Sequence, residues 1–222
     1  MSNFDKCLPI ILKHEGGFSN IRSDPGNWTG GRVGVGELRG TNYGIASHAH
    51  PHLDIKNLTV QQAGVIYREQ YWVPVKGDEL PIGVDLAVFD FGVNSGPRRA
   101  AMALQRAVGV ADDGAIGPIT LAAVKRKSPE DIISRICSDR LSFMRRLSTW
   151  PTFGRGWQRR VEGVEREAIR MAMDAALHTV TAPAPVIPRT YPPLAVEPAP
   201  AAPVSGWAAL FKAIARIFGG KS

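Results

Sequence analysis

The stretch His14-Glu15-Gly16-Gly17-Phe18 places a carboxylate at the end of an apolar-striped segment and directly before two glycines. The segment before it predicts a helix over residues 4–15, because its apolar residues recur at helical spacing. The two glycines can adopt left-handed backbone angles, which end a helix. We therefore expect Glu15 to close a helix and to overhang a cleft. The apolar residues are Phe4, Leu8, Ile11 and Leu12.

Glu15, Asp24 and Thr41 form a set that can split a glycosidic bond. This reaction needs a carboxylic acid that protonates the leaving oxygen and a second group that activates water or stabilises the transition state. The apolar neighbours of Glu15 should raise its pKa, as a general acid requires. Asp24, in a polar turn, is expected to stay ionised as the base or electrostatic partner, and Thr41 would orient the attacking water. The alternative is structural: a solvated helix end and an ordinary Asp-Pro-Gly turn.

Six motifs follow one another along roughly residues 4–178, and together they resemble the signature of glycoside hydrolase family 108. Those enzymes are N-acetylmuramidases of phage lysis cassettes and bacterial secretion systems. The motifs are His14-Glu15-Gly16-Gly17-Phe18, Asp24-Pro25-Gly26, Thr41-Asn42-Tyr43-Gly44-Ile45, Tyr71-Trp72, Phe89-Asp90-Phe91-Gly92-Val93-Asn94-Ser95-Gly96 and Gly156-Trp157.

The resemblance implies a mainly α, lysozyme-like helical domain with a small β-hairpin or loop region near the active site. It implies hydrolysis of the β-1,4 bond between N-acetylmuramic acid and N-acetylglucosamine in peptidoglycan, and it maps the family's motif glutamate onto Glu15. Two other functions stay open. One is a lytic transglycosylase that uses Glu15 alone, and the other is a non-catalytic protein that binds the wall or disrupts membranes.

Between its second and third motifs the chain departs from the related phage-type lysozymes, in which Thr follows Asp closely. Here residues 27–40 separate Asp24 from Thr41. This insertion is rich in Gly, with Val, Trp and Arg between, which predicts a hairpin or a loop. It also contains Glu37, a carboxylate that competes with Asp24 for the second catalytic role.

Three residues are candidates for sugar binding. Trp28 and Tyr43 can stack on sugar faces, and Asn94 lies in the fifth motif. Arg32 and Arg39 can meet the muramyl carboxylate or the acids of the stem peptide. For Trp28 the alternative is that the ring only packs the loop onto the domain.

The rest of the core is predicted as six further helices. Asp90 lies in an otherwise apolar one, where a lone charge is too costly to leave unpaired, so we expect it to be hydrogen-bonded or ion-paired. The segment 112–120 resembles an element of helical peptidoglycan-binding modules. Pro9 should remove one backbone bond from the first helix. The helices are expected at about residues 59–72, 80–94, 97–108, 117–125, 128–148 and 153–177.

Cysteine and histidine usage indicates no metal and no other cofactor. Cys7 and Cys137 lack the spacing of metal or redox sites and are expected to be buried thiols. His48, His50 and His52 alternate around a proline, which favours a polar loop over a metal site.

The length of 222 residues, with 44% hydrophobic content and no long apolar span, predicts one catalytic domain and an appendage. We place the domain at residues 1–180, with a peptidoglycan-binding-like helical part at about 97–178. Residues 181–206 are rich in Pro and Ala and predict a stiff linker.

Residues 207–222 have the pattern of an amphipathic helix that lies in a membrane interface. Their apolar face carries Trp207, Phe211 and Ile214, and Lys212 lies on the other face. We expect contact with the outer membrane or lipopolysaccharide. The alternative is a helix that docks on the core or on a partner chain.

The net charge of +7 favours encounter with anionic polymers, of which peptidoglycan is the expected partner. No nucleic-acid motif appears, and we expect a monomer.

Asp5 and a brief apolar run at 8–12 do not fit a signal peptide. We therefore expect an endolysin, of phage or bacterial origin, that is made in the cytoplasm, is released through a holin-like pore or by another route and lyses bacteria from the periplasm.

Overall fold

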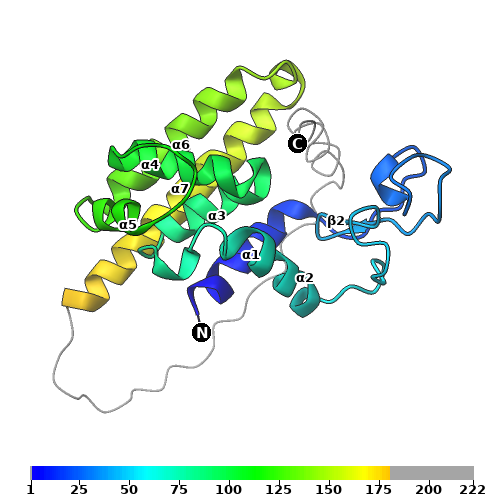
Figure 1. Ribbon diagram of the computed structural model, residues 1–222, viewed down its shortest axis with the longest axis horizontal. Coiled ribbons are helices and arrows are strands. Elements are labelled where there is room, and N and C mark those ends of the chain that lie inside the picture. Colours follow the sequence, from blue (N-terminus) through cyan, green and yellow to red (C-terminus); the bar gives the residue numbers. More distant parts are fainter. Residues whose placement is uncertain (1, 181–222) are drawn as a thin grey trace, which may run out of the picture.

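The computed structural model describes residues 2–180, which form a helical part and a smaller lobe at residues 16–59 (Figure 1). This architecture confirms the predicted mainly α, lysozyme-like fold with a small β-region. The predicted linker and amphipathic helix lie outside the described residues. The α-helices are α1 (Asn3–Glu15), α2 (Val60–Tyr67), α3 (Val84–Ser95), α4 (Pro97–Val108), α5 (Pro118–Val124), α6 (Pro129–Arg145) and α7 (Trp150–Val180).

Helix α1 begins with a capping box and ends at the first glycine of the opening motif. The Ser2 hydroxyl accepts from the backbone N–H of Asp5, and the Asp5 carboxylate accepts from that of Ser2. Gly16, with a φ of 75°, ends the helix directly after Glu15. Pro9 lies inside the helix on its exposed side. The buried side chains of α1 are Phe4, Cys7, Leu8, Ile11 and Glu15.

Helix α2 continues into a π-helical turn, η2 (Arg68–Trp72). The capping box predicted at Thr59 and Gln62 is present. The wider turn changes the angular spacing of the side chains, and it leaves Tyr67 and Trp72 buried with Tyr71 half-buried.

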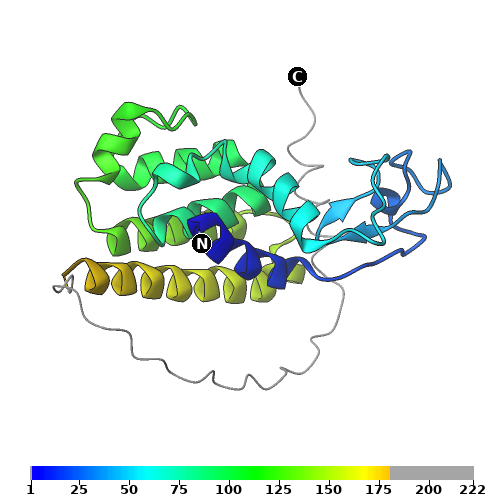
Figure 2. The same ribbon diagram turned by 90° about the horizontal axis from the view of Figure 1, so that it is seen from below.

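Helix α3 is the centre of the helical part and packs against α1, α4, α6 and α7. It starts at Val84, later than predicted, because Gly83 has a φ of 88°. A Cβ atom on Gly83 would lie 2.2 Å from the carbonyl oxygen of Ala168, so this glycine permits close contact with α7. Figure 2 shows α7 running the length of the helical part. Among residues 2–180, no helix has the length and apolarity needed to cross a membrane.

The lobe contains a two-stranded antiparallel sheet, β1 (Thr41–Asn42) and β2 (Ile45–Ala46). Tyr43 and Gly44 connect the strands with φ angles of 49° and 72°, as in a type I′ turn. The insertion is also hairpin-like, since Trp28 bridges Leu38. A short 3₁₀ helix, η1 (Pro25–Asn27), precedes it, and another, η3 (Gly77–Glu79), precedes α3.

Helices α4 to α7 hold the peptidoglycan-binding-like segment. Helix α4 packs on α5 and α6, α6 packs on α7, and α4, α6 and α7 all pack on α3. The Gln105 side chain holds the turn that resembles such modules. Its Nε2 donates to Asp113 Oδ1 and to the carbonyl of Ala115, and its Oε1 accepts from the N–H of Gly114. Cys7 and Cys137 are buried free thiols, as predicted.

Candidate active site

Helix α1 ends where the helical part meets the lobe (Figure 1), and Glu15 is its last residue. Its side chain is buried rather than overhanging an open cleft, with 5% of the residue exposed. Glu15 Oε1 accepts a hydrogen bond of 2.9 Å from Nη2 of Arg160, which belongs to α7. The candidate acid is therefore ion-paired inside the protein.

Arg160 also binds Asp90, on α3, and so joins two carboxylates. Its Nη2 and Nε donate to Asp90 Oδ1 at 2.7 and 3.1 Å. Asp90 Oδ2 accepts at 2.5 Å from Nη1 of Arg140, on α6. The side chains of all these residues are at most 1% exposed. The prediction that Asp90 is ion-paired is confirmed. We refer to Glu15, Asp90, Arg140 and Arg160 as the buried charge cluster.

Burial and charge act in opposite directions on the two acids of the cluster. Burial raises the pKa of Glu15 to about 7, although Arg160 opposes the shift. Burial would also raise the pKa of Asp90, but the charges of Arg160 and Arg140 outweigh it and hold that pKa well below its usual range. At neutral pH Asp90 is therefore ionised, while a substantial fraction of Glu15 is protonated.

The turn between β1 and β2 lies against the second oxygen of Glu15. A Cβ atom added to Gly44 would be 3.0 Å from Glu15 Oε2 and 3.0 Å from the Tyr67 hydroxyl. That hydroxyl donates to the carbonyl oxygen of Tyr43 at 2.8 Å, which fixes the turn. Within residues 2–180, no group donates a hydrogen bond to Oε2. Oε2 is therefore the oxygen available to carry a proton.

Asp24 and Thr41 both lie in the lobe and are connected through Asn27. Asp24 Oδ1 accepts from the N–H of Gly26 at 3.1 Å and caps η1. The Thr41 hydroxyl donates to Asn27 Oδ1 at 2.7 Å, and the backbone N–H of Asn27 donates to the carbonyl of Asp24. Both side chains thus help to hold the lobe, and their catalytic roles stay predictions.

The sugar-binding candidates differ in their surroundings. Trp28 is buried, and its Nε1 donates to the carbonyl of Arg22, which fits the alternative that the ring packs the loop. Tyr43 is half-buried in the turn against Glu15. Asn94 is buried on α3, and its Nδ2 has no hydrogen-bond partner among the described residues. The roles of Trp28, Tyr43 and Asn94 in sugar binding stay predictions.

The competing carboxylate, Glu37, is on the outside of the insertion. Its side chain is 68% exposed and forms an ion pair of 2.6 Å with Arg39. Arg39 also donates to the carbonyl of Pro51, and Arg32 is exposed. Glu37 is therefore a solvent-exposed carboxylate that, among the described residues, is held only by its ion pair with Arg39.

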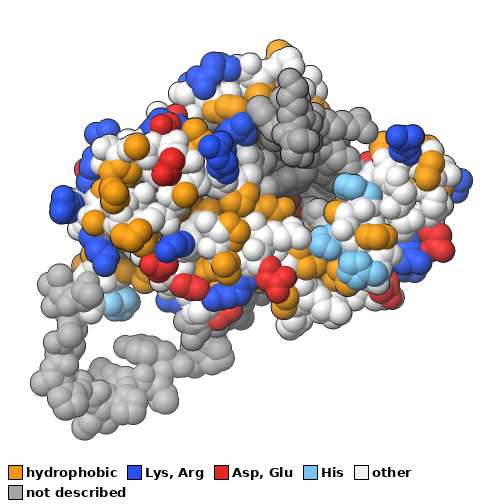
Figure 3. All heavy atoms as spheres, in the orientation of Figure 1, with side chains coloured by type: hydrophobic (Ala, Val, Ile, Leu, Met, Phe, Trp, Pro, Cys, Tyr) orange, Lys and Arg blue, Asp and Glu red, His pale blue; other side chains and the backbone are white. Residues whose placement is uncertain are grey.

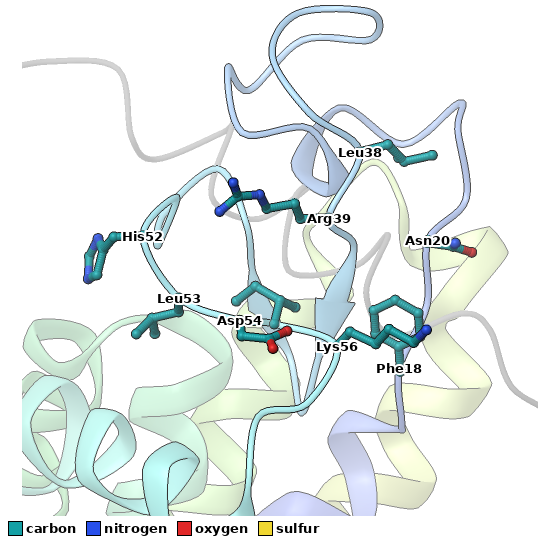
Figure 4. A pocket seen from close by; sticks show the side chains of 9 residues that line it. Phe18, Asn20, Leu38, Arg39, His52, Leu53, Asp54 and Lys56 are labelled. Carbon is teal, nitrogen blue, oxygen red and sulfur yellow. The ribbon is translucent and has the colours of Figure 1, made fainter.

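A pocket of about 450 Å³ opens in the lobe, and it includes none of the predicted catalytic residues (Figure 4). Arg39 projects into it between His52 and Leu38. His side chains gather on the lobe, while Lys and Arg are spread over the helical part (Figure 3). Among the described residues no group of His, Cys, Asp or Glu is suited to hold a metal. The pocket is lined by Phe18, Asn20, Leu38, Arg39, His52, Leu53, Asp54, Ile55 and Lys56.

Sequence reasoning missed Arg140, Arg160 and Asn27. Arg160 had a signal, because it lies within the apolar stripe of α7 that includes Trp157, Val161 and Val164. An arginine on an inward stripe needs a buried acid as partner. The sequence did not indicate that Asp90 and Glu15 would both bind Arg160.

Fold and site define a lysozyme-like glycoside hydrolase. The family model for glycosyl hydrolase 108 matches residues 8–96, and a model for a predicted peptidoglycan domain matches residues 99–162. A solved structure, described as Brucella abortus SagA, is 40% identical with a TM-score of 0.65, and the match covers 78% of this chain and 97% of that one. The comparison with curated proteins gave no match.

The chain therefore belongs to glycosyl hydrolase family 108. Its activity is that of a glycoside hydrolase directed at peptidoglycan.

We predict that Gly44→Ala lowers turnover as well as stability. The new methyl group would press on Glu15 Oε2 and on the Tyr67 hydroxyl, and alanine is strained at this positive φ. The strain costs about 1 kcal/mol or more. Gly109→Ala is the matched control, because Gly109 has a φ of 79° with no atom within 4 Å of its Cβ position. Thermal unfolding should show a loss in both variants, and only Gly44→Ala should lose peptidoglycan cleavage. Equal activity in the two variants would contradict the close contact.

Proposed function

We propose that this protein is an N-acetylmuramidase that hydrolyses the β-1,4 bond between N-acetylmuramic acid and N-acetylglucosamine. The observation that supports this most directly is Glu15, a buried carboxyl group with a pKa raised to about 7 at the end of α1. A general acid works best when its pKa lies near the working pH. The membership of the chain in a glycoside hydrolase family supports this role.

In the proposed reaction, the proton on Glu15 Oε2 moves to the glycosidic oxygen while the bond from that oxygen to the anomeric carbon breaks. Positive charge develops on the sugar ring, in an oxocarbenium-like transition state. Water then adds its hydroxyl group to the anomeric carbon, and its remaining proton restores the acid. The products are a reducing N-acetylmuramic acid end and a free 4-hydroxyl on N-acetylglucosamine.

Asp24 is our candidate for the second catalytic group. It is half-buried at the start of η1, where its Oδ1 accepts a hydrogen bond of 3.1 Å from the backbone N–H of Gly26. An ionised carboxylate can activate the water or stabilise the developing positive charge. Glu37, exposed and paired with Arg39, is the less favourable candidate.

We expect Glu15→Gln to keep the fold and abolish cleavage. The amide has the shape of the acid and still offers Arg160 an oxygen, but it has no proton to donate. General acid catalysis contributes about a hundredfold to ten-thousandfold, so the loss should be of that size. Mass spectrometry of digested peptidoglycan is the measurement, with circular dichroism as the control for folding.

The products of the unmodified protein distinguish the alternatives. Reducing muramic ends support hydrolysis, and anhydro ends would show a lytic transglycosylase. No cleavage by a folded protein would indicate a wall-binding protein. If Glu15→Gln cleaved walls at the original rate, Glu15 would not be the acid.

For the second carboxylate we compare Asp24→Asn with Glu37→Gln. Asp24→Asn should reduce turnover strongly, because the neutral amide can neither activate water nor balance positive charge. Glu37→Gln should change turnover little, since its carboxylate is solvated. Initial rates on purified peptidoglycan test both variants, and a larger loss in Glu37→Gln would reverse the assignment.

We further propose that residues 207–222 bind the outer membrane or lipopolysaccharide after release of the protein into the periplasm. This proposal rests on the sequence pattern, because the segment lies outside the described residues. Burying one large apolar side chain in a lipid interface offers roughly 1.5 to 3 kcal/mol before ordering costs.

Deletion of residues 181–222 should therefore leave cleavage of purified peptidoglycan almost unchanged and reduce lysis of intact Gram-negative cells. Phe211→Asp combined with Ile214→Asp should reproduce the deletion, because two charges on the apolar face prevent its burial. Matched turbidity assays on purified walls and on cells provide the comparison. An equal loss on both substrates would mean that the tail serves the catalytic domain instead.

A further inference from the structure

Arg160 divides its hydrogen bonds unequally between two buried carboxylates. Asp90 receives two donors, Nη2 at 2.7 Å and Nε at 3.1 Å, while Glu15 Oε1 receives only Nη2 at 2.9 Å. A guanidinium group has a rigid fork of donors, so binding Asp90 fixes the direction in which the shared Nη2 points. Glu15 is therefore held by a cation whose own orientation is set by a third residue.

Building on the proposed role of Glu15 as the acid, we propose that Arg160 is its positioning residue. Arg160 binds Oε1, so that Oε2 can carry the transferable proton. Asp90 supplies a negative counter-charge, without which the positive charge of Arg160 would keep Glu15 ionised.

The charge count of the cluster explains why the counter-charge is needed. Arg140 and Arg160 supply two positive charges, and Asp90 supplies one negative charge. With Glu15 ionised the cluster is neutral, and with Glu15 protonated it keeps one positive charge. Without Asp90 that surplus would be two charges in a buried site, and Glu15 would be held in the ionised form. An ionised Glu15 has no proton to give.

The groups that face Glu15 come from every element packed around it. Arg160 and Arg140 lower its pKa, and Asp90 raises it. Tyr67, on α2, and Tyr71, on η2, also face the Glu15 charge, and burial with that charge raises the pKa of each phenol. They therefore stay neutral near pH 7. The adjacent His14 has its pKa lowered by burial and by Arg160, so it too is largely neutral there.

The cluster also joins the two segments matched by different family models. Glu15 and Asp90 lie in the glycosyl hydrolase match at residues 8–96. Arg140 and Arg160 lie in the peptidoglycan-domain match at residues 99–162. The peptidoglycan-domain segment thus supplies Arg160, the residue that binds the proposed acid. This assigns it a part in catalysis that its description does not include.

The test compares pH–rate profiles of Asp90→Asn and Asp85→Asn in the full chain. Both remove a buried acid from α3, but the Asp85 carboxylate accepts from the backbone N–H groups of Gly83 and Leu86 and has no hydrogen bond or ion pair with the described residues of the cluster. A general acid loses activity as the pH rises through its pKa. Removing the Asp90 charge lowers the pKa of Glu15, so the alkaline limb of Asp90→Asn should move to lower pH. The alkaline limb of Asp85→Asn should stay in place.

Arg160→Lys is the second variant, and it is needed because Asp90→Asn leaves two buried arginines poorly balanced. Lysine keeps the charge but lacks the fork that reaches both carboxylates. We expect kcat to fall by about tenfold to a hundredfold through misplacement of the acid, with KM unchanged. Arg170→Lys, an exposed position on the same helix, should leave both constants unchanged. A soluble peptidoglycan oligosaccharide is the substrate.

Two outcomes would overturn the proposal. One is an alkaline limb in folded Asp90→Asn that coincides with that of Asp85→Asn. The other is an unchanged kcat in folded Arg160→Lys. Failure of the proposed function gives a different result whatever the two cluster variants do. The unmodified protein would then release anhydro ends or cleave nothing, or Glu15→Gln would keep its activity.

Discussion

The interaction on which the rest of this structure depends is the pairing of buried Asp90 with Arg140 and Arg160. A buried carboxylate costs several kcal/mol unless charges and hydrogen bonds compensate it, and removal of one partner of such a pair costs about 3–5 kcal/mol. Asp90 is on α3, Arg140 on α6 and Arg160 on α7. The three helices must therefore meet at one level along their lengths, which fixes their relative register.

The same pairing determines where the candidate acid can lie. Asp90 and Arg160 fix α3 and α7 to each other. In this arrangement Nη2 of Arg160, which donates to both Asp90 and Glu15, points toward the end of α1. Gly16 ends α1 at that place, and the turn at Gly44 closes against Glu15 from the lobe. Structural stability and the placement of the acid thus use one set of side chains. A substitution in the cluster will affect both, and the position of the alkaline limb in a pH–rate profile reports on the acid separately from stability.

Local rules predicted much of this molecule. The capping box at Thr59, the prolines that begin α4 to α6 and the glycine after Glu15 act within a few residues, so their effects are visible in the sequence. The need to pair Asp90 was also predictable, because burial of a charge has a known cost. Its partners were not predictable, since they lie 50 and 70 residues away and many arginines were available. The hydrogen bond between Thr41 and Asn27 forms because the insertion at residues 27–40 folds back on itself. The spacing of the residues along the sequence does not predict this fold.

The two acids of the cluster give opposite pH dependences, because burial dominates the pKa of Glu15 whereas Arg160 and Arg140 outweigh burial at Asp90. Glu15 has a pKa raised from 4.5 to about 7, so the folded state binds this proton more tightly than the unfolded state does. Its contribution to stability is present below about pH 4.5 and is lost as the pH rises to about 7. Asp90, with its pKa lowered from 3.8, stabilises the fold above that pH and loses the effect as the pH falls below it. Between these limits the fold prefers a protonated Glu15 beside an ionised Asp90, and this is the protonation state that the proposed reaction needs.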